Sequence, residues 1–169
     1  MSLYFEWRKS CGCRVPCNCK TSTKSTEAMY YSAQTKEARE IPPEHHEKLL
    51  TLEVKTKFPK ERIKLDSILS ILLETGTVQE YSYYIEFTLW RNDILITTQH
   101  FASLRQLGQI DQVKTIIGTM NISWTDYIAS PGSYIYTVKA KRSDLLEENL
   151  TNVKIKNGTL NALVMPSHN

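Results

Sequence analysis

The sequence predicts an all-β fold, and three observations support this prediction. Stretches in which every second residue is apolar recur between residues 49 and 166. Turn sequences built from Gly, Pro, Asn and Asp separate several of these stretches. No segment carries a convincing amphipathic helix pattern. About eight or nine short strands joined by tight turns are typical of a β-sandwich or a barrel.

The first predicted strand is LLTLEVKTKF, which runs to Pro59. From Leu50 to Phe58, apolar side chains and one Thr alternate with polar ones, as in a strand with one solvated face. RIKLDSILSILLE and EYSYYIEFTLW follow, and each places large apolar residues at alternate positions. The residues Arg91–Asp93 then predict a tight turn, so that ILITTQHF forms a hairpin with the preceding strand.

Three further stretches complete the predicted sheets. In VKTIIGTMNISW, Gly118 is a candidate break or bulge. The sequence SPGS (Ser130–Ser133) predicts a turn before the alternating stretch YIYTVKAK. In NVKIKNGTLNALVM, Asn157-Gly158 lies between two apolar runs and predicts a hairpin turn.

The length and strand number favour one type of sandwich. Eight strands within roughly 120 residues suit a jelly roll. An immunoglobulin-like sandwich is the alternative, and that fold usually has a core Trp and often a cysteine pair. Trp90 and Trp124 are present, but no cysteine follows Cys19. We therefore predict a jelly-roll β-sandwich of about eight strands with an extended N-terminal arm.

The predicted arm comprises residues 1–47, and the predicted β domain comprises residues 48–169. The arm is rich in Ser, Thr, Lys and Glu, has no sustained periodicity, and ends near Pro42-Pro43. Its segment STEAMYYSAQTKEARE is compatible with a short helix. Because every strong strand pattern follows it, we expect the arm to be dispensable for folding, so that a chain beginning near Glu47 folds alone.

All four cysteines lie in the arm, within SCGCRVPCNCK, at Cys11, Cys13, Cys17 and Cys19. Four interpretations are open: a zinc site of four thiolates, two local disulfides, disulfides between arms of different copies, or reduced thiols. Structural zinc sites mostly use C-x2-4-C pairs rather than C-x-C. Flanking Arg and Lys residues favour reactive thiolates, and the β domain has no cysteine to pair with them. Disulfides between arms are therefore the favoured interpretation.

The sequence contains no recognisable catalytic or metal-binding motif. The two adjacent histidines of EHHE (Glu44–Glu47) cannot converge on one ion without backbone contortion, and His100 stands alone in its strand. The Asp residues, including Asp126, lie near turns and strand ends, where Asp commonly serves turn chemistry. We expect neither an enzyme nor a bound cofactor or metal.

Charge and hydropathy argue against two further classes. The net charge is only +3 and no basic face dominates, so nucleic-acid binding has little support. The longest apolar run, ILSILL, is too short to cross a bilayer, and the N-terminus lacks the apolar core and cleavage site of a secretory signal. We expect a chain without a membrane span, made in a cytoplasm without a Sec-type export route.

Four stretches occur in an order that resembles a known group of proteins: RIKLDSILSILLE, YYIEFTLWRNDILITT, ISWTDYIASPGSYIYTVKAKR and NVKIKNGTLNALVMP. The run resembles the small jelly-roll proteins of bacterial spore surfaces, which include endospore appendage (pilus) subunits and the C1q/TNF-like domains of exosporium proteins. The resemblance covers about residues 50–166. Its motifs are L-x-R-N before a hairpin, W-x-D…PG-x-Y-x-Y-x-V, and a final N-x-x-L-x-A strand.

The resemblance implies a structural subunit that assembles with itself, and with other spore-surface proteins, into a fibre or an exosporium layer. Sheet edges would pair between copies, and the arm would pack on neighbours through Leu3, Tyr4, Phe5 and Trp7. In appendage subunits the arm cysteines bond to cysteines in the neighbour's jelly roll. Because this jelly roll has none, any cross-link must join arm to arm.

The alternative function is a trimeric C1q/TNF-like binding module or adhesin tip on a filament, in which the arm would only anchor the trimer. In both cases the resemblance places the protein on the spore surface. The absence of a secretion signal fits assembly inside a mother cell that later lyses, after which the protein is extracellular.

Overall fold

The computed structural model describes residues 27–43, 45–76, 80–106, 114–143 and 149–166. These residues form nine strands and no helix. The strands are β1 (Met29–Thr35), β2 (Arg39–Glu40), β3 (Glu47–Thr56), β4 (Arg62–Thr75), β5 (Glu80–Arg91), β6 (Ile94–Gln106), β7 (Lys114–Tyr127), β8 (Gly132–Arg142) and β9 (Leu150–Met165).

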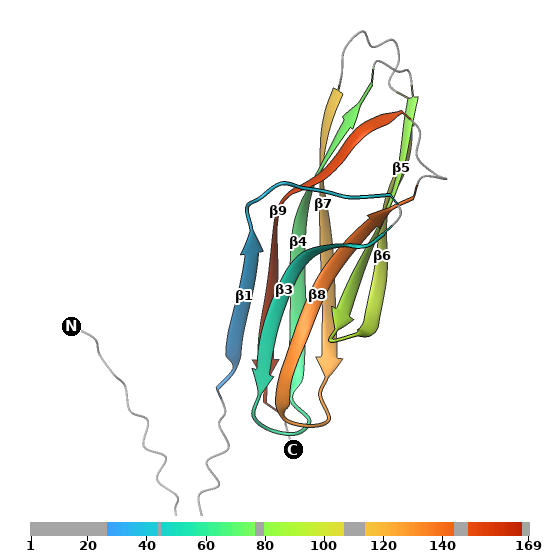
Figure 1. Cartoon of the computed structure of the whole chain (residues 1–169). Helices are drawn as coiled ribbons and strands as arrows, with labels where there is room; N and C mark the ends of the chain where they lie inside the picture. The colour runs from blue at the N-terminus through green and yellow to red at the C-terminus, as the bar shows by residue number, and fades with distance from the viewer. Residues whose placement is uncertain (1–26, 44, 77–79, 107–113, 144–148, 167–169) are drawn as a thin grey trace, which may run out of the picture.

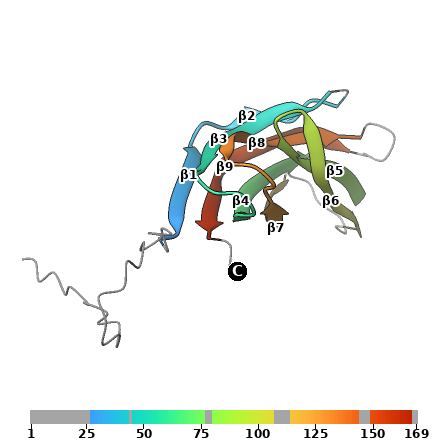
Figure 2. The same cartoon turned by 90° about the horizontal axis from the view of Figure 1, so that it is seen from below.

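The strands form two sheets that pack face to face (Figures 1 and 2). We call them sheet A, ordered β1-β9-β4-β7 with β2 also paired to β9, and sheet B, ordered β3-β8-β5-β6. Every strand pair is antiparallel. The predicted all-β sandwich is therefore confirmed.

The long strand pairs are nested within one another. β1 pairs with β9, β3 with β8, β4 with β7, and β5 with β6. The innermost pair is the β5–β6 hairpin that the sequence predicts. Its turn residue Asn92 has a φ of 52° and bonds to β8 in both directions, through its N–H to the Ile135 carbonyl and through its Oδ1 to the Ile135 N–H. Two Greek keys wrapped into two four-stranded layers in this nested order make a jelly roll.

Alternation along the strands builds the core between the sheets. On β4, every second residue from Ile63 to Thr75 is buried, and five of these are large and apolar: Ile63, Leu65, Leu69, Ile71 and Leu73. The alternate residues of β4 are exposed or partly exposed. A strand with period-two hydrophobicity has one face to bury, and the second sheet supplies the cover. The predicted strand patterns on β3, β4, β5 and β8 are confirmed in this way.

The segment from residue 29 to residue 43 differs from the prediction. The described part of STEAMYYSAQTKEARE, from Glu27 onward, contains no helix, and it contains β1, which pairs with β9 over its whole length. β1 turns Met29, Tyr31 and Ala33 toward the core. The sequence gives little sign of this, because the stretch is short and its alternating apolar residues are separated by another Tyr and by a Ser.

After β1, the chain crosses from one sheet to the other and stays attached to both. β2 pairs with β9, and the Ile41 N–H donates to the Val153 carbonyl at 2.9 Å. The Ile41 side chain is fully buried, and the Pro42 carbonyl accepts from the Arg142 N–H of sheet B. The expected boundary at residue 47 therefore cuts through the sandwich, whose first strand is β1.

The hairpin predicted at Asn157-Gly158 is also wrong, because β9 runs continuously through both residues. Gly158 instead allows a close approach inside the core. A Cβ at this position would lie 2.6 Å from Leu69 Cδ2 and 3.3 Å from Leu50 Cδ1. Gly118 has a similar role in β7, where a Cβ would lie 2.4 Å from the Phe101 ring, so it is not a break.

Replacement of Gly158 with Ala is expected to destabilise the fold by about 1–3 kcal/mol, because the added methyl overpacks a filled site. Gly132→Ala is the matched control, since its Cβ would come no closer than 3.8 Å to its nearest neighbour, the Tyr134 side chain. Urea unfolding of both variants measures the difference. Equal unfolding free energies would contradict the packing role of Gly158.

Candidate assembly surfaces

The site residues predicted from the sequence lie outside the described residues. This applies to Cys11, Cys13, Cys17 and Cys19, and equally to the arm-packing residues Leu3, Tyr4, Phe5 and Trp7. The structure thus neither brings the four thiols together nor separates them. What it does position are the sheet edges and the outer faces that a second copy would meet.

A largely buried polar network joins the two sheets through side chains of β5, β7 and β8. Arg91 of β5 donates from Nη1 to both carboxylate oxygens of Asp126 on β7, at 2.9 Å each. The Tyr136 hydroxyl of β8 donates to Asp126 Oδ2 at 2.7 Å. Only 24% of the Arg91 side chain and 12% of the Asp126 side chain are exposed. Asp126 therefore holds sheet A to sheet B, and the turn role expected for it is wrong.

Three residues of this network belong to motifs that the sequence resemblance singled out. Asp126 is the acidic residue of W-x-D, Tyr136 is the second Tyr of PG-x-Y-x-Y, and Arg91 precedes the hairpin turn in L-x-R-N. Tyr134, the first Tyr of the motif, lies under the Arg91 guanidinium, 6.0 Å from ring centroid to Cζ. These motif residues thus share a structural purpose, which is to fix the stacking of the two sheets.

Burial and the hydrogen bond to Asp126 raise the pKa of the Tyr136 hydroxyl far above its usual range. In the unfolded chain a tyrosine loses its proton near pH 10, whereas folded Tyr136 keeps it. Its contribution to stability is therefore complete below about pH 10 and is lost as the pH rises further. Above that pH the unfolding free energy should fall by up to about 1.4 kcal/mol per pH unit through this residue.

Tyr136→Phe is expected to make this alkaline decrease shallower, since Phe has no proton to lose. The exposed Tyr127, replaced with Phe, is the control and should leave the slope unchanged. Urea unfolding between pH 8 and pH 11 measures the slopes, and a Tyr136→Phe slope equal to that of the unmodified chain would contradict the assignment.

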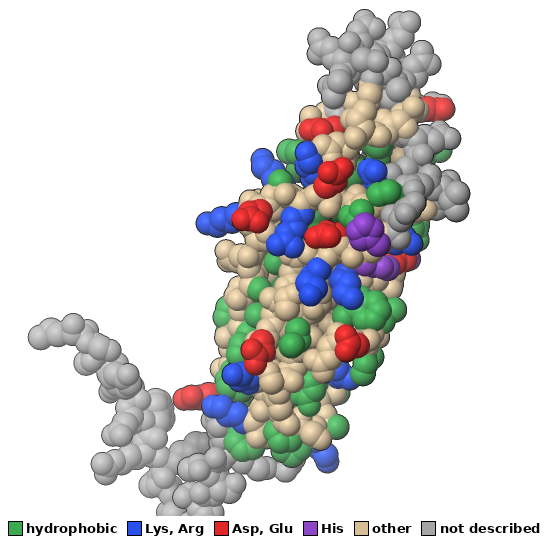
Figure 3. Space-filling view, viewed as in Figure 1, with side chains coloured by type: hydrophobic (Ala, Val, Ile, Leu, Met, Phe, Trp, Pro, Cys, Tyr) green, Lys and Arg blue, Asp and Glu red, His purple; other side chains and the backbone are tan. Residues whose placement is uncertain are grey.

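Exposed hydrophobic side chains are concentrated on one side of the sandwich. Ten large ones are exposed among the described residues, and six of these lie on the edge strands β6 and β7. They are Ile94, Leu95, Leu104, Ile117, Trp124 and Tyr127. Figure 3 shows hydrophobic side chains gathered along the side of the molecule where β6 lies. We call the edges of these two strands the β6/β7 side.

The edges on the β6/β7 side lack charges over most of their length. No Asp, Glu, Lys or Arg occurs between Ile94 and Leu104 of β6, or between Thr115 and Thr125 of β7. Soluble proteins commonly protect free edges with charges, prolines, bulges or shortness, because an open row of backbone N–H and C=O groups can pair with another chain. Between Thr115 and Thr125, β7 has no charge, no proline and no bulge, and its register with β4 is unbroken over fourteen residues.

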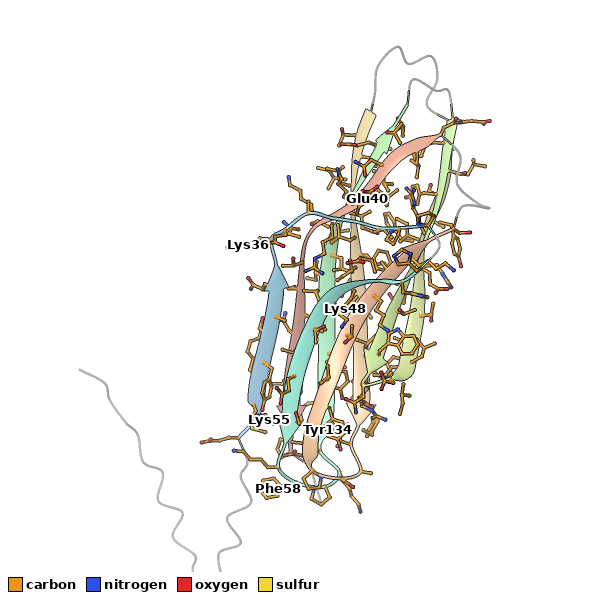
Figure 4. The ribbon with its side chains drawn as sticks, in the orientation of Figure 1. Lys36, Glu40, Lys48, Lys55, Phe58 and Tyr134 are labelled. Atoms are coloured by element: carbon orange, nitrogen blue, oxygen red, sulfur yellow. The ribbon has the colours of Figure 1, made fainter. Side chains whose placement is uncertain are left out.

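The opposite side of the sandwich, formed by β1 and β3, is better protected. β3 carries Glu47, Lys48, Glu53 and Lys55, and its pairing with β8 contains a register shift between Lys48 and Leu50. Figure 4 shows the β3 lysines on this side, with Lys36 near the end of β1. The Tyr31 hydroxyl of β1 donates to the Lys55 carbonyl at 3.1 Å, which closes this side of the sandwich.

A groove of about 490 Å³ opens where β1 leaves β3. Its lining is largely polar and includes Lys36, Glu37, Arg39 and Lys48. Arg39 is already engaged, since its Nη1 donates to the Lys48 carbonyl at 2.6 Å and lies 3.8 Å from Glu47 Oε1. The groove carries both positive and negative side chains, and Arg39 already has partners. Its lining therefore does not specify one class of ligand.

His46, just before β3, and His100 of β6 each contact a β5 side chain on the outer face of sheet B. His46 Nε2 is 2.9 Å from Glu86 Oε1, and His100 Nδ1 is 2.7 Å from the Tyr84 hydroxyl. Within the described residues, no group of three or more His, Cys, Asp and Glu side chains is arranged to hold a metal ion. The same part of the chain contains no helix long and apolar enough to cross a membrane.

Comparisons with known proteins leave the family open. No protein-family model and no curated protein matches the chain. Among solved structures, that of the infectious bursal disease virus Gx strain is 12% identical, with a TM-score of 0.40, over 84% of this chain and 33% of that chain. Dimeric latent PorU from Porphyromonas gingivalis is 12% identical, with a TM-score of 0.37, over 81% of this chain and 13% of that chain.

Proposed function

We propose that this protein is a structural subunit that assembles with copies of itself into a fibre or layer on the surface of a bacterial spore. The observation that carries the proposal is the β6/β7 side, where two long edges combine exposed hydrophobic side chains with an absence of charge. Such an edge is an aggregation hazard in a monomer, whereas in a subunit it forms a contact by continuing the sheet into the next copy.

The N-terminal segment supplies the second part of the proposal. It places four cysteines and the hydrophobic residues of SLYFEW ahead of β1, outside the sandwich motifs. Contacts through the sheets and contacts through the arms act together, and linked contacts of this kind hold an assembly far more strongly than either alone. Disulfides between arms would then make the assembly covalent.

Electron microscopy of the purified full-length chain tests the proposal. Fibres or extended layers are expected. Discrete trimers would instead favour the C1q/TNF-like binding module implied by the same sequence resemblance, and monodisperse monomers at high concentration would contradict both.

Oxidation of the assembled protein is expected to give a ladder of multimers on non-reducing gels, which collapses when reductant is added. Proximity of the arms within the assembly should drive the reaction, at roughly millimolar effective concentration. Replacing Cys11, Cys13, Cys17 and Cys19 with Ser should abolish the ladder and leave the circular dichroism spectrum unchanged. An assembly that runs as a monomer without reductant would contradict the cross-link, and about one zinc per chain would favour the metal site.

A further inference from the structure

We infer that two copies of this chain join through their β7 edges in a two-fold symmetric contact, so that sheet A continues from one copy into the other. This inference rests on the proposed function, because it identifies the partner of one edge of the subunit. It differs from that function in its prediction of a closed pair as the unit from which larger assemblies are built.

β7 is the least protected edge of the sandwich. β1 is only seven residues long, β3 carries alternating Glu and Lys and a register shift, and the β5–β6 pairing has a register shift at the start of β6. β7 has fourteen residues in unbroken register with β4 and no charge from Thr115 to Thr125. An added strand therefore finds its longest uninterrupted row of backbone groups along β7.

Several large apolar side chains on β7 are exposed, and a further strand beside β7 would cover part of them. Trp124 pairs with the buried Leu65, so it belongs to the inner face of sheet A, yet it is 39% exposed. Ile117 and Tyr127 are on the outer face and are 68% and 71% exposed. Among the described strands, only β4 pairs with β7, and a strand added at the free edge of β7 would shield part of these side chains from water.

Of the surfaces on this chain, the one that best matches the apolar β6/β7 side is the same side of a second copy. On the β1/β3 side, the strands expose only one large hydrophobic residue among those described, Tyr30. A head-to-tail contact would therefore set an apolar edge against a charged one. An isologous contact sets apolar against apolar, and it pairs two antiparallel strands, as the rest of both sheets already does.

The uncharged stretch of β7 is centred on Met120. If the two-fold axis passes there, Thr119 of one copy lies opposite Asn121 of the second copy, on the outer face. On the inner face, Trp124 lies opposite the second copy's Ile116, which is itself only half-buried. Facing residues in an antiparallel pair are about 5 Å apart, so each Trp124 would gain an apolar neighbour.

The first test introduces positive charge on β7. It uses the full-length chain in which the four cysteines are replaced with Ser. Light scattering on a sizing column should give a smallest species of twice the mass of the 19.5 kDa chain, since the pair is the unit of any larger assembly. Thr119→Lys together with Asn121→Lys should give a monomer, because each Lys would face another Lys across the axis. Ser32→Lys with Gln34→Lys on β1 is the matched control, on the same face at the other edge of sheet A, and should remain a dimer.

The second test detects the symmetry directly and does not depend on how the charged variants fold. In the same cysteine-free chain, single cysteines replace Ile117, Thr119, Asn121 or Ser123, and a short bifunctional thiol reagent is added. A residue near a two-fold axis lies close to the same residue of the second copy. Cross-linked dimers should therefore form at Thr119 and Asn121 and be weak at Ile117 and Ser123, which lie further from the axis. A single cysteine at Ser32 should give none.

The outcomes separate this inference from the proposed function. Fibres in the microscope without any cross-link at a β7 position would overturn the β7 contact and leave the proposed function standing. Cross-linked dimers at β7 without any larger assembly of the unmodified chain would support the β7 contact and overturn the proposed function. If cross-links need one cysteine on β7 and a second on β1, the contact is head-to-tail and the inference is wrong.

Discussion

A chain that begins at Glu47 is expected to lose its cooperative fold. It lacks β1, which pairs with β9 over seven residues, and it lacks the fully buried Ile41. Loss of a buried Ile side chain alone costs about 2–5 kcal/mol. Together with the exposed edge of β9, the total should exceed about 5 kcal/mol, which is comparable to the whole stability of many domains. Thermal unfolding followed by circular dichroism measures the effect.

The control is a chain that begins at Glu27, which keeps every strand of the described residues. It should unfold cooperatively near the temperature of the full-length chain. The shorter chain should instead aggregate, because the uncovered β9 edge would be free to pair. If both chains unfold at the same temperature, β1 contributes nothing to the sandwich and the boundary expected at residue 47 is correct after all.

Asp126→Ala is expected to destabilise the protein by about 3–5 kcal/mol. The carboxylate of Asp126 accepts two hydrogen bonds from Arg91 and one from Tyr136. Its removal leaves a mostly buried guanidinium and a fully buried hydroxyl without their shared partner, and breaking a buried ion pair from one side has a cost of this size. Because the three residues come from both sheets, the loss should also loosen the stacking of the sandwich.

Asp66→Ala provides the matched control on sheet A. Asp66 forms an ion pair with Lys64 at 3.7 Å and accepts a hydrogen bond from the Ser123 hydroxyl at 2.7 Å. In contrast to Asp126, 43% of its side chain is exposed. Surface pairs of this kind contribute about 0–1 kcal/mol. Urea unfolding compares the two variants, and an Asp126→Ala effect no larger than that of Asp66→Ala would show that the network does not hold the sheets together.

Several elements of the fold could be predicted from local patterns. The alternation in LLTLEVKTKF and RIKLDSILSILLE follows from the two-residue period of a strand with one buried face, and both stretches are strands. The short turn at Asn92 is also a local signal, since Asn tolerates a positive φ. These signals need only neighbouring residues to act, and so they are present in the sequence itself.

Other residues carried misleading local signals. Asn157-Gly158 is the strongest hairpin dipeptide in the chain, yet Gly158 is needed because Leu69 and Leu50 leave no room for a Cβ. Asp126 resembles a turn residue, yet its partners Arg91 and Tyr136 lie 35 and 10 residues away, on strands of the other sheet. In both cases contacts across the sandwich contribute more free energy than the local preference, and such contacts depend on register and stacking that one segment does not encode.

The fold class, the positions of most strands and the confinement of every cysteine to the N-terminal segment follow from the order of residues alone. The place of β1 in the sandwich, the link that Asp126 makes between the two sheets and the open edge of β7 emerge only from the folded arrangement. The difference arises because alternation fixes which face of a strand is buried. Which strand lies beside it, and whether its edge is left open, depends on pairing with residues more than a hundred positions away, as between Tyr30 and Leu163.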